Sequence, residues 1–177
     1  MTLKTKIVKS AVFAAACAVL IFLDQWSKSW MQQKLLKDGP MVIIPKILGF
    51  YYVENTGAAF NLLDKQRVLF LIIASVAVVV CIYVFFKTLN KEAQEKKTSI
   101  LIFHVFLCLI ISGAIGNAID RLINGYVVDF IRVLFINFPV FNIADCYVVV
   151  GCIFFLIFGL LRKETIDDIE GSLKRHG

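Results

Sequence analysis

The fold of this chain is decided first by residues 68–86, VLFLIIASVAVVVCIYVFF, an apolar run without a charged residue. A transmembrane helix needs roughly 20 mostly apolar residues, within a range of about 17–25. The run therefore predicts a helix that spans a membrane. The whole chain agrees with this interpretation, because 59% of its 177 residues are hydrophobic, against about 45–50% in soluble domains.

Three more segments are predicted to cross the membrane, at about residues 7–23, 99–119 and 140–161. The first and the last reach a spanning length only if polar residues at one end are included. The sequence contains no repeat and no linker-like tract. We therefore expect a single domain over residues 1–177: an all-α membrane protein with four transmembrane helices and a small extracytoplasmic β-element.

The orientation of the spans is predicted from basic residues. Lysines precede the first span (Lys4, Lys6, Lys9) and lie between the second and third (Lys87, Lys91, Lys96, Lys97), and basic residues follow the fourth (Arg162, Lys163, Lys174, Arg175). Because cytoplasmic loops are enriched in Lys and Arg, both termini are expected in the cytoplasm. The net charge of +6 is thus a topology signal, and no nucleic-acid partner is expected.

A cleaved signal peptide is the competing interpretation of the N-terminus, because Ala14-Ala15-Ala16-Cys17 resembles a lipoprotein cleavage site. The apolar stretch before Cys17 is short and the hydrophobic run continues to Leu23. A signal-peptide core usually has about 7–15 residues and ends at the cleavage site. A retained span is therefore the preferred prediction.

The two outward connections, at about residues 30–67 and 120–139, are expected to form a small sheet beside the membrane. Met41–Ile44 and Phe50–Val53 are β-rich runs separated by Pro45 and Gly49, and a turn signal follows at Asn55-Thr56-Gly57 before Ala58-Ala59-Phe60. Asn124-Gly125 in the second connection is a hairpin-like signal.

Ionisable residues gather at the outward ends of the spans, where burial makes them expensive and marks them as functional candidates. The carboxylates there outnumber the permanent cations Lys28 and Arg121, so at least one is expected to hold a proton at neutral pH. The group consists of the ionisable residues Asp24, Lys28, Asp120, Arg121, Asp129 and Asp145, accompanied by the neutral polar residues Asn117 and Asn142.

Asp129 and Asp145 are the preferred catalytic pair. Asp24 with Lys28, and Asp120 with Arg121, can each be read as structural charges that end a helix. Asp129 and Asp145 have little compensating charge nearby in sequence, apart from Arg132, and apolar residues flank both. Aspartyl chemistry needs one ionised carboxylate to take a proton from water and one protonated carboxyl to polarise the scissile carbonyl.

Other catalytic classes fit poorly. His104 and His176 are the only histidines and no HExxH motif occurs, so no metal site is expected. The five scattered cysteines suggest no disulfide framework. Ser112 lacks a base, because His104 lies two helical turns away, so Ser112 and Gly116 are read as small residues that let the third span pack closely.

Five strings of residues, in order, resemble the lipoprotein signal peptidase family, also called signal peptidase II. They are Asp24-Gln25-Trp26-Ser27-Lys28, Val53-Glu54-Asn55-Thr56-Gly57-Ala58-Ala59-Phe60, Gly113-Ala114-Ile115-Gly116-Asn117-Ala118-Ile119-Asp120-Arg121, Val127-Val128-Asp129-Phe130 and Phe141-Asn142-Ile143-Ala144-Asp145. The chain departs from the usual pattern at Asn61, Ser112 and Cys146, none of which is part of the proposed pair.

The resemblance implies that Asp129 and Asp145 are the catalytic dyad. It implies supporting or substrate-binding roles for Asp24, Lys28, Asn55, Gly57, Asn117, Asp120, Arg121 and Asn142. It further implies cleavage of the signal peptide just before a diacylglyceryl-modified cysteine in bacterial prolipoproteins, at the extracytoplasmic face of the cytoplasmic membrane. No cofactor is expected; the expected partners are the prolipoprotein, membrane lipids and globomycin-type inhibitors.

Two alternatives remain from other classes. A small transporter or channel subunit could use the carboxylates as an ion relay, but a relay should thread the bilayer and the second span carries no charge. A non-catalytic assembly factor would tolerate loss of both Asp129 and Asp145.

Overall fold

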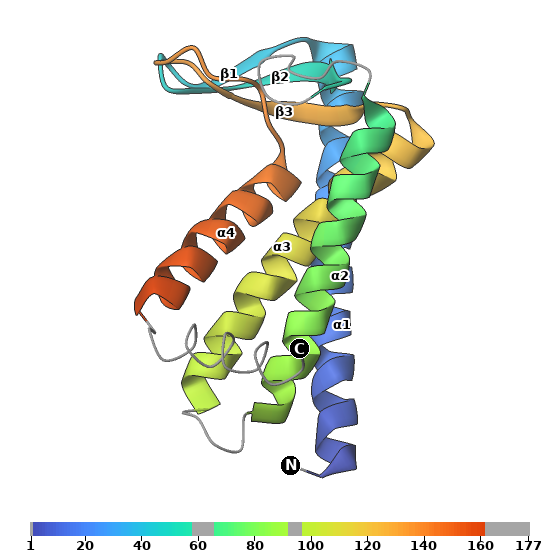
Figure 1. Cartoon of the computed structure of the whole chain (residues 1–177). Coiled ribbons are helices and arrows are strands. Elements are labelled where there is room, and N and C mark those ends of the chain that lie inside the picture. Colours follow the sequence, from blue (N-terminus) through green and yellow to red (C-terminus); the bar gives the residue numbers. More distant parts are fainter. Residues whose placement is uncertain (1, 58–65, 92–96, 162–177) are drawn as a thin grey trace.

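The computed structural model describes residues 2–57, 66–91 and 97–161, in which four helices stand beneath a small sheet (Figure 1). The helices are α1 (Leu3–Asp38), α2 (Arg67–Lys91), α3 (Lys97–Ile123) and α4 (Ile143–Leu161). Residues 58–65, 92–96 and 162–177 lie outside the described residues, and with them the predicted Ala58-Ala59-Phe60 motif, Lys96 and the C-terminal basic residues.

Helix α1 is much longer than the predicted span and includes residues 30–38, which the sequence assigned to a loop. The helix begins after Thr2, whose Oγ1 accepts a hydrogen bond from Thr5 N, and runs unbroken through Cys17. It ends at Gly39, whose φ of 78° suits a glycine. The loop prediction failed because contacts with a distant part of the chain hold the last turns: Met31 and Leu35 pack against Phe130 of the sheet.

The predicted sheet is confirmed. In the described part of the chain it has three antiparallel strands in the order β1 (Met41–Ile44), β2 (Leu48–Asn55), β3 (Val127–Val133). Both connections contribute, because β1 and β2 come from the first and β3 from the second. The sheet covers the end of the helices away from the N-terminus (Figure 1).

The hairpin predicted at Asn124-Gly125 is wrong. Those residues join α3 to β3, with Gly125 at φ 86° and Asn124 N donating to Asp120 O. Helix α3 continues to Ile123, which leaves no strand before the turn for β3 to pair with. The hairpin lies instead at residues 45–47, between β1 and β2, where Ile47 N donates to Ile44 O.

Three helices in the described residues are long and apolar enough to cross a membrane: α1, α2 over Arg67–Leu89 and α3 over Ile100–Ile123. The apolar part of α4, Ile143–Phe158, is shorter. Its helix starts three residues later than the predicted span, because Phe141 pairs with Ile131 of β3 through backbone hydrogen bonds. Residues 140–142 therefore lie beside β3 and outside the helix.

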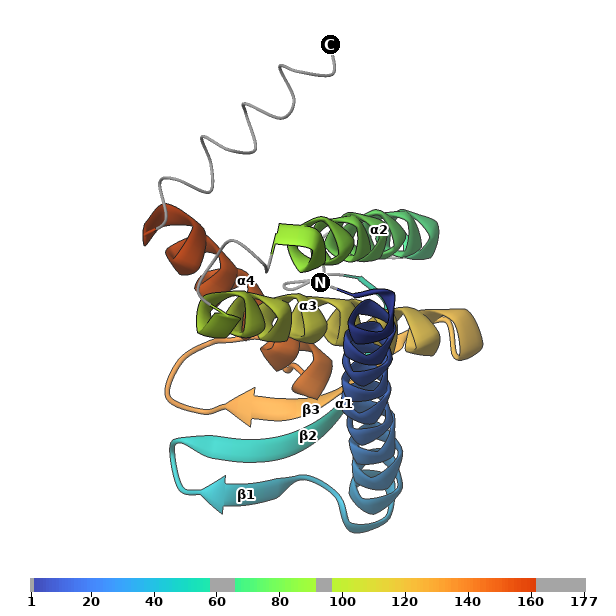
Figure 2. The same ribbon diagram turned by 90° about the horizontal axis from the view of Figure 1, so that it is seen from below.

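Helix α3 is the centre of the bundle and packs against α1, α2 and α4 (Figure 2). Small residues permit this, as predicted for Ser112 and Gly116. A Cβ on Gly113 would collide with Ala144 O and Val148 of α4, and a Cβ on Gly116 would lie 2.5 Å from Asp24 Oδ2 of α1. The close approach brings polar ends of three helices together.

Candidate active site

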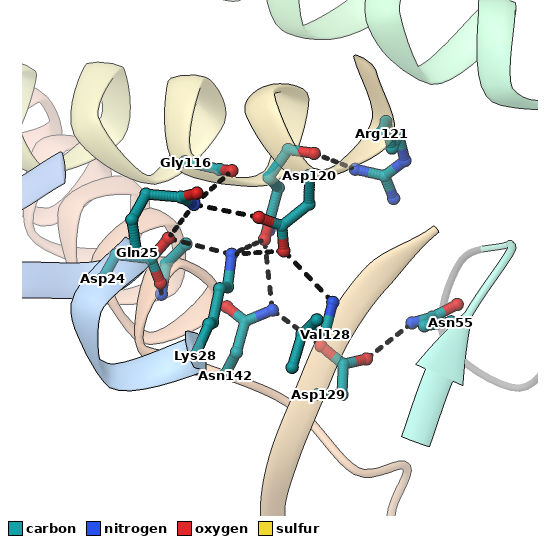
Figure 3. Close-up of polar contacts among 12 residues, drawn as sticks. Asp24, Gln25, Lys28, Asn55, Gly116, Asp120, Arg121, Val128, Asp129 and Asn142 are labelled. Atoms are coloured by element: carbon teal, nitrogen blue, oxygen red, sulfur yellow. Dashed lines mark hydrogen bonds and ion pairs between the residues drawn. The ribbon is translucent and has the colours of Figure 1, made fainter. Parts of the chain in front are cut away.

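The first part of the site is a buried ion cluster between α1 and α3. Lys28 Nζ lies 2.8 Å from Asp24 Oδ2 and 3.1 Å from Asp120 Oδ2 (Figure 3). Asp24 is 0% and Lys28 2% exposed. Asp24 and Lys28 share a helix face four residues apart, as predicted. One ammonium group therefore holds two carboxylates and joins the two helices.

Gln25 also belongs to this cluster, although it carries no charge that would mark it in the sequence. Its Nε2 is within hydrogen-bond distance of Asp120 Oδ1 (2.9 Å), Gly116 O (3.1 Å) and Asp24 Oδ2 (3.2 Å). A search for charges at membrane depth passes over a neutral amide. Its position beside Asp24 at a span end was the available signal.

Backbone groups complete the hydrogen bonding of the same carboxylates. Val128 N donates to Asp120 Oδ2 at 3.1 Å, and Ala144 N donates to Asp24 Oδ1 at 2.9 Å. Val128 lies in β3 and Ala144 at the start of α4. The ion cluster thus fixes the strand and the helix that carry Asp129 and Asp145.

Asp145 is held by the N-terminus of α4. Asn142 Oδ1 accepts from Asp145 N at 3.0 Å, while Asp145 Oδ2 accepts from Asn142 N at 3.0 Å. This reciprocal arrangement is a capping box, which satisfies backbone donors at a helix start. A carboxylate in the first turn is also stabilised by the positive end of the helix dipole.

Two asparagine side chains link the ion cluster to the candidate pair. Asn117 Oδ1 accepts from Lys28 Nζ at 2.9 Å, and its Nδ2 donates to Asp145 Oδ1 at 2.7 Å. Asn142 Nδ2 is 3.1 Å from Asn117 Oδ1 and 2.6 Å from Asp129 Oδ1. Both candidate aspartates are therefore positioned by neutral amide groups.

The register of the sheet places Asn55 beside Asp129. Val53 is paired with Asp129 and Asn55 with Val127, so Asn55 and Asp129 are diagonal neighbours on one face. Asn55 Nδ2 donates to Asp129 Oδ2 at 2.8 Å (Figure 3). The other side of the amide accepts from Gly57 N at 3.0 Å, which fixes the turn.

Asp129 is almost completely buried, with 1% of its surface exposed, whereas Asp145 is half-buried. Burial, and after it the charge of Asp145, raise the pKa of Asp129 to about 7, and hydrogen bonds from Asn55 and Asn142 oppose the rise. Asp129 is therefore partly protonated at neutral pH, mainly because its carboxyl group is buried and to a smaller extent because a second carboxylate is near.

The sequence allowed Arg121 to be interpreted as the partner of Asp120 in an ion pair at the helix end, but its hydrogen bonds go to backbone carbonyl groups. Its guanidinium donates to Gly57 O and Asn117 O at 3.3 Å and lies 4.6 Å from the Phe70 ring of α2. It connects the end of the Asn55 turn to α3. Arg132 lies over the Tyr51 ring, at 4.8 Å.

All ten site residues predicted from the sequence lie in this one region, in α1, α3, α4, strands β2 and β3 and the segments beside them. Ser112 lies apart, with its Oγ donating to Cys17 O at 3.4 Å. His104 contacts Thr88 of α2, with 2.9 Å between its Nε2 and Thr88 Oγ1. Ser112 and His104 therefore do not form a nucleophile and base.

Two carboxylates that accept hydrogen bonds from asparagine side chains thus lie together at one end of the apolar helices. This combination of fold and site is that of the membrane aspartic peptidases. A profile of the family described as Signal peptidase (SPase) II matches residues 16–161. The chain belongs to the signal peptidase II family.

Similar proteins agree with this assignment. A lipoprotein signal peptidase of Enterococcus faecalis is 38% identical over 157 residues, covering 89% of this chain and 92% of that one. A lipoprotein signal peptidase of Streptococcus pneumoniae is 38% identical over 156 residues, covering 88% and 96%. A solved bacterial membrane enzyme, determined by the in meso method at 2.3 Å resolution, superposes with a TM-score of 0.68 at 28% identity, covering 87% of this chain and 90% of that one.

Proposed function

We propose that this protein removes the signal peptide from diacylglyceryl-modified prolipoproteins and that Asp129 and Asp145 activate the water that cleaves the peptide bond. The observation that supports this assignment is that one residue, Asn142, contacts both aspartates. Its side chain donates a hydrogen bond to Asp129 and caps the helix turn that carries Asp145. No metal or cofactor takes part in the proposed reaction.

The surroundings of the two carboxyl groups support different roles. Asp129, whose pKa is raised to about 7, is the partner that carries the shared proton and polarises the scissile carbonyl. Asp145 accepts hydrogen bonds from Asn117 Nδ2 and Asn142 N at the start of α4 and is the proposed base. Its partial exposure gives water access to that carboxylate.

In the proposed reaction, ionised Asp145 takes a proton from a water molecule while the water oxygen attacks the carbonyl carbon. The Asp129 carboxyl donates a hydrogen bond to the carbonyl oxygen, which stabilises the negative charge of the tetrahedral intermediate. The C–N bond then breaks. The proton held by Asp145 passes to the nitrogen of the departing lipid-modified cysteine, and both carboxyl groups return to their starting state.

The reaction requires an interface, because water must reach the scissile bond while the acyl chains of the substrate stay in lipid. Asp129 lies in β3, part of the sheet that covers one end of the helices, and Asp145 lies in the first turn of α4. The lipid-facing apolar surfaces of α2 to α4 are the proposed seat for these acyl chains. A cyclic peptide of the globomycin type would compete with the substrate at this site.

The proposed topology has four spans, with α4 as the fourth, and both termini in the cytoplasm. The basic residues beside the first span and at the start of α3, such as Lys9 and Lys97, support this orientation. The sheet and Asp129 would then face the extracytoplasmic side of a bacterial membrane. An ion relay has no support from the relatives that this chain matches.

Cleavage of a purified diacylglyceryl-modified prolipoprotein by the purified chain, with and without globomycin, tests the proposal. Asp129→Asn and Asp145→Asn should each lower kcat by about 10²–10⁴-fold, the usual contribution of a general acid or base, while the proteins still insert and fold. Substantial turnover by either variant would contradict the assignment.

Asp24→Asn is the matched control, because Asp24 belongs to the ion cluster with Lys28. Its main effect is expected on folding or as a partial loss of activity. A well-folded Asp24→Asn protein without any activity would show that the pair was chosen wrongly.

A further inference from the structure

An apolar groove of about 860 Å³ lies between α1 and α3, at the end of the bundle far from the candidate active site. Its lining includes Lys9 of α1, and about 28 Å of helix separates Lys9 from Lys28 at 1.5 Å per residue. The Lys9 end of the groove therefore lies in the opposite membrane leaflet from the site, and the groove extends from there along α1 to Leu20. Nothing in the proposed reaction uses it.

Aromatic and aliphatic side chains form the floor and rims of the groove. Phe13 stacks on Phe85 of α2, with ring centroids 4.0 Å apart, and closes its floor. At the rims, Val12 is 64% and Leu101 63% exposed. These surfaces face outward, so the groove opens toward the hydrocarbon of the membrane.

The mouth of the groove is positively charged. Lys9 is part of its lining, and Lys6 and Lys4 lie within the two helical turns before it. The cytoplasmic leaflet carries anionic lipids that attract basic residues beside the membrane. An apolar channel with an ammonium group at its entrance complements a molecule with a long hydrocarbon chain and a phosphate.

We infer that this groove binds one glycerophospholipid of the leaflet nearest the N-terminus, with an acyl chain between α1 and α3 and its phosphate at Lys9. The volume lies within the range of about 300–1,000 Å³ that is usual for sites of small ligands. The lipid would fill the gap between two helices that carry the ion cluster, and would thereby stabilise their packing.

Charge favours a phospholipid over two other possible occupants of the groove, a signal peptide and a second copy of this chain. The signal peptide of a prolipoprotein has a positively charged N-terminal region, which Lys4, Lys6 and Lys9 would repel. A second copy of the chain would bring a second set of the same lysines to the groove. A phosphate is attracted where either of these is repelled.

The test is photo-crosslinking of the full chain in phosphatidylcholine nanodiscs that contain a phosphatidylglycerol with a diazirine in its acyl chain. Crosslinks should map to residues 8–20 of α1 and 101–109 of α3. A diacylglycerol probe with the same chains but no phosphate should label these segments about five-fold less, and Lys9→Gln should reduce the phospholipid labelling about five-fold, as expected for one Lys near a lipid surface.

Ala16→Phe, which fills the groove, should lose most of the labelling, whereas Ala14→Phe is the matched control because Ala14 does not line the groove. Cleavage of prolipoprotein should persist in both and reports correct folding. If Ala16→Phe does not fold, Lys9→Gln decides alone. Equal labelling by both lipid probes, equal loss in both phenylalanine variants, or preferential crosslinking of the segments to a diazirine-bearing signal peptide would each overturn the inference.

Discussion

The side-chain amide of Asn142 lies 2.6 Å from Asp129 Oδ1, although Asp129 is in a strand and Asn142 immediately precedes a helix. The same asparagine caps α4 through its Oδ1, which accepts from Asp145 N. One side chain therefore sets the position of both proposed catalytic residues, and its two functions can be separated by substitution.

Asn142→Ser should keep the helix cap and lose the bond to Asp129, because serine is about as good an N-cap as asparagine. Thermal unfolding should stay close to that of the unmodified protein, whereas Asn142→Ala should lose about 0.5–2 kcal/mol. Both variants should lose much of kcat. Equal activity of Asn142→Ser and the unmodified protein would show that the bond to Asp129 is dispensable.

The pH dependence of kcat/KM should have an alkaline limb near pH 7. The pKa of Asp129 is raised to about 7, mainly by burial, so the proton that the pair needs is lost as the pH rises through that value. Asn55→Ala removes a hydrogen bond that lowers this pKa. The limb should therefore move to higher pH in Asn55→Ala and stay in place in Gln33→Ala, an exposed amide on α1.

The same shift predicts how stability depends on pH. Between its ordinary pKa of 3.8 and about 7, Asp129 binds a proton in the folded state that it loses in the unfolded state. Its contribution to stability is thus complete below pH 3.8 and is lost as the pH rises to about 7. Asp129→Asn removes the buried charge, so this variant should unfold at a higher temperature than the unmodified protein at pH 8, but not at pH 4.

Lys28→Met should destabilise the fold strongly, because it leaves Asp24 and Asp120 buried without their cation. Breaking one partner out of a buried ion pair costs about 3–5 kcal/mol. Chemical denaturation should reveal the loss, while Lys37→Met, at an exposed site on the same helix, should change little. Similar stabilities of the two variants would show that the ion cluster does not hold α1 to α3.

Ser112→Ala should retain activity within about two-fold, because the hydrogen bonds of the Ser112 hydroxyl, such as the one to Cys17 O, join neutral groups and are of modest value. Steady-state cleavage of the lipidated precursor measures this. A large fall in kcat with normal folding would revive a serine nucleophile.

Gly113→Ala should weaken the contact of α3 with α4, since an added Cβ collides with Ala144 O. Overpacking of this kind costs about 1–3 kcal/mol. The shift of α4 should move Asp145 and lower kcat more than it raises KM. Ala114→Gly, at the next residue, is the control. It should lower the stability of the fold by about 1 kcal/mol through helix propensity, without lowering kcat more than it raises KM.

Local signals predicted the strands but not every boundary. The β-rich run at residues 41–44 coincides with β1, because its residues favour a strand and Pro45 ends it. Residues 30–38 were misassigned because the reason for their helix lies elsewhere in the chain, in the packing of Met31 and Leu35 on Phe130. An Asn-Gly pair favours a turn both in a hairpin and between a helix and a strand. Only the strand with which β3 pairs, which is β2, shows that Asn124-Gly125 is not a hairpin turn.

The sequence by itself predicted that Asp24, Lys28, Asp120, Asp129 and Asp145 gather at one end of the apolar helices, because all five lie at or beside the same ends of the apolar segments. The tertiary structure alone decided which polar groups from different helices and strands meet, beyond the local pair of Asp24 and Lys28. Lys28 forms ion pairs with both Asp24 and Asp120. The carboxylates of Asp129 and Asp145 instead accept hydrogen bonds from the side-chain amides of Asn55, Asn117 and Asn142. The reason is that side-chain distances across α1, α3, α4 and the sheet depend on which elements pack against Gly113 and Gly116, and no local pattern encodes those partners.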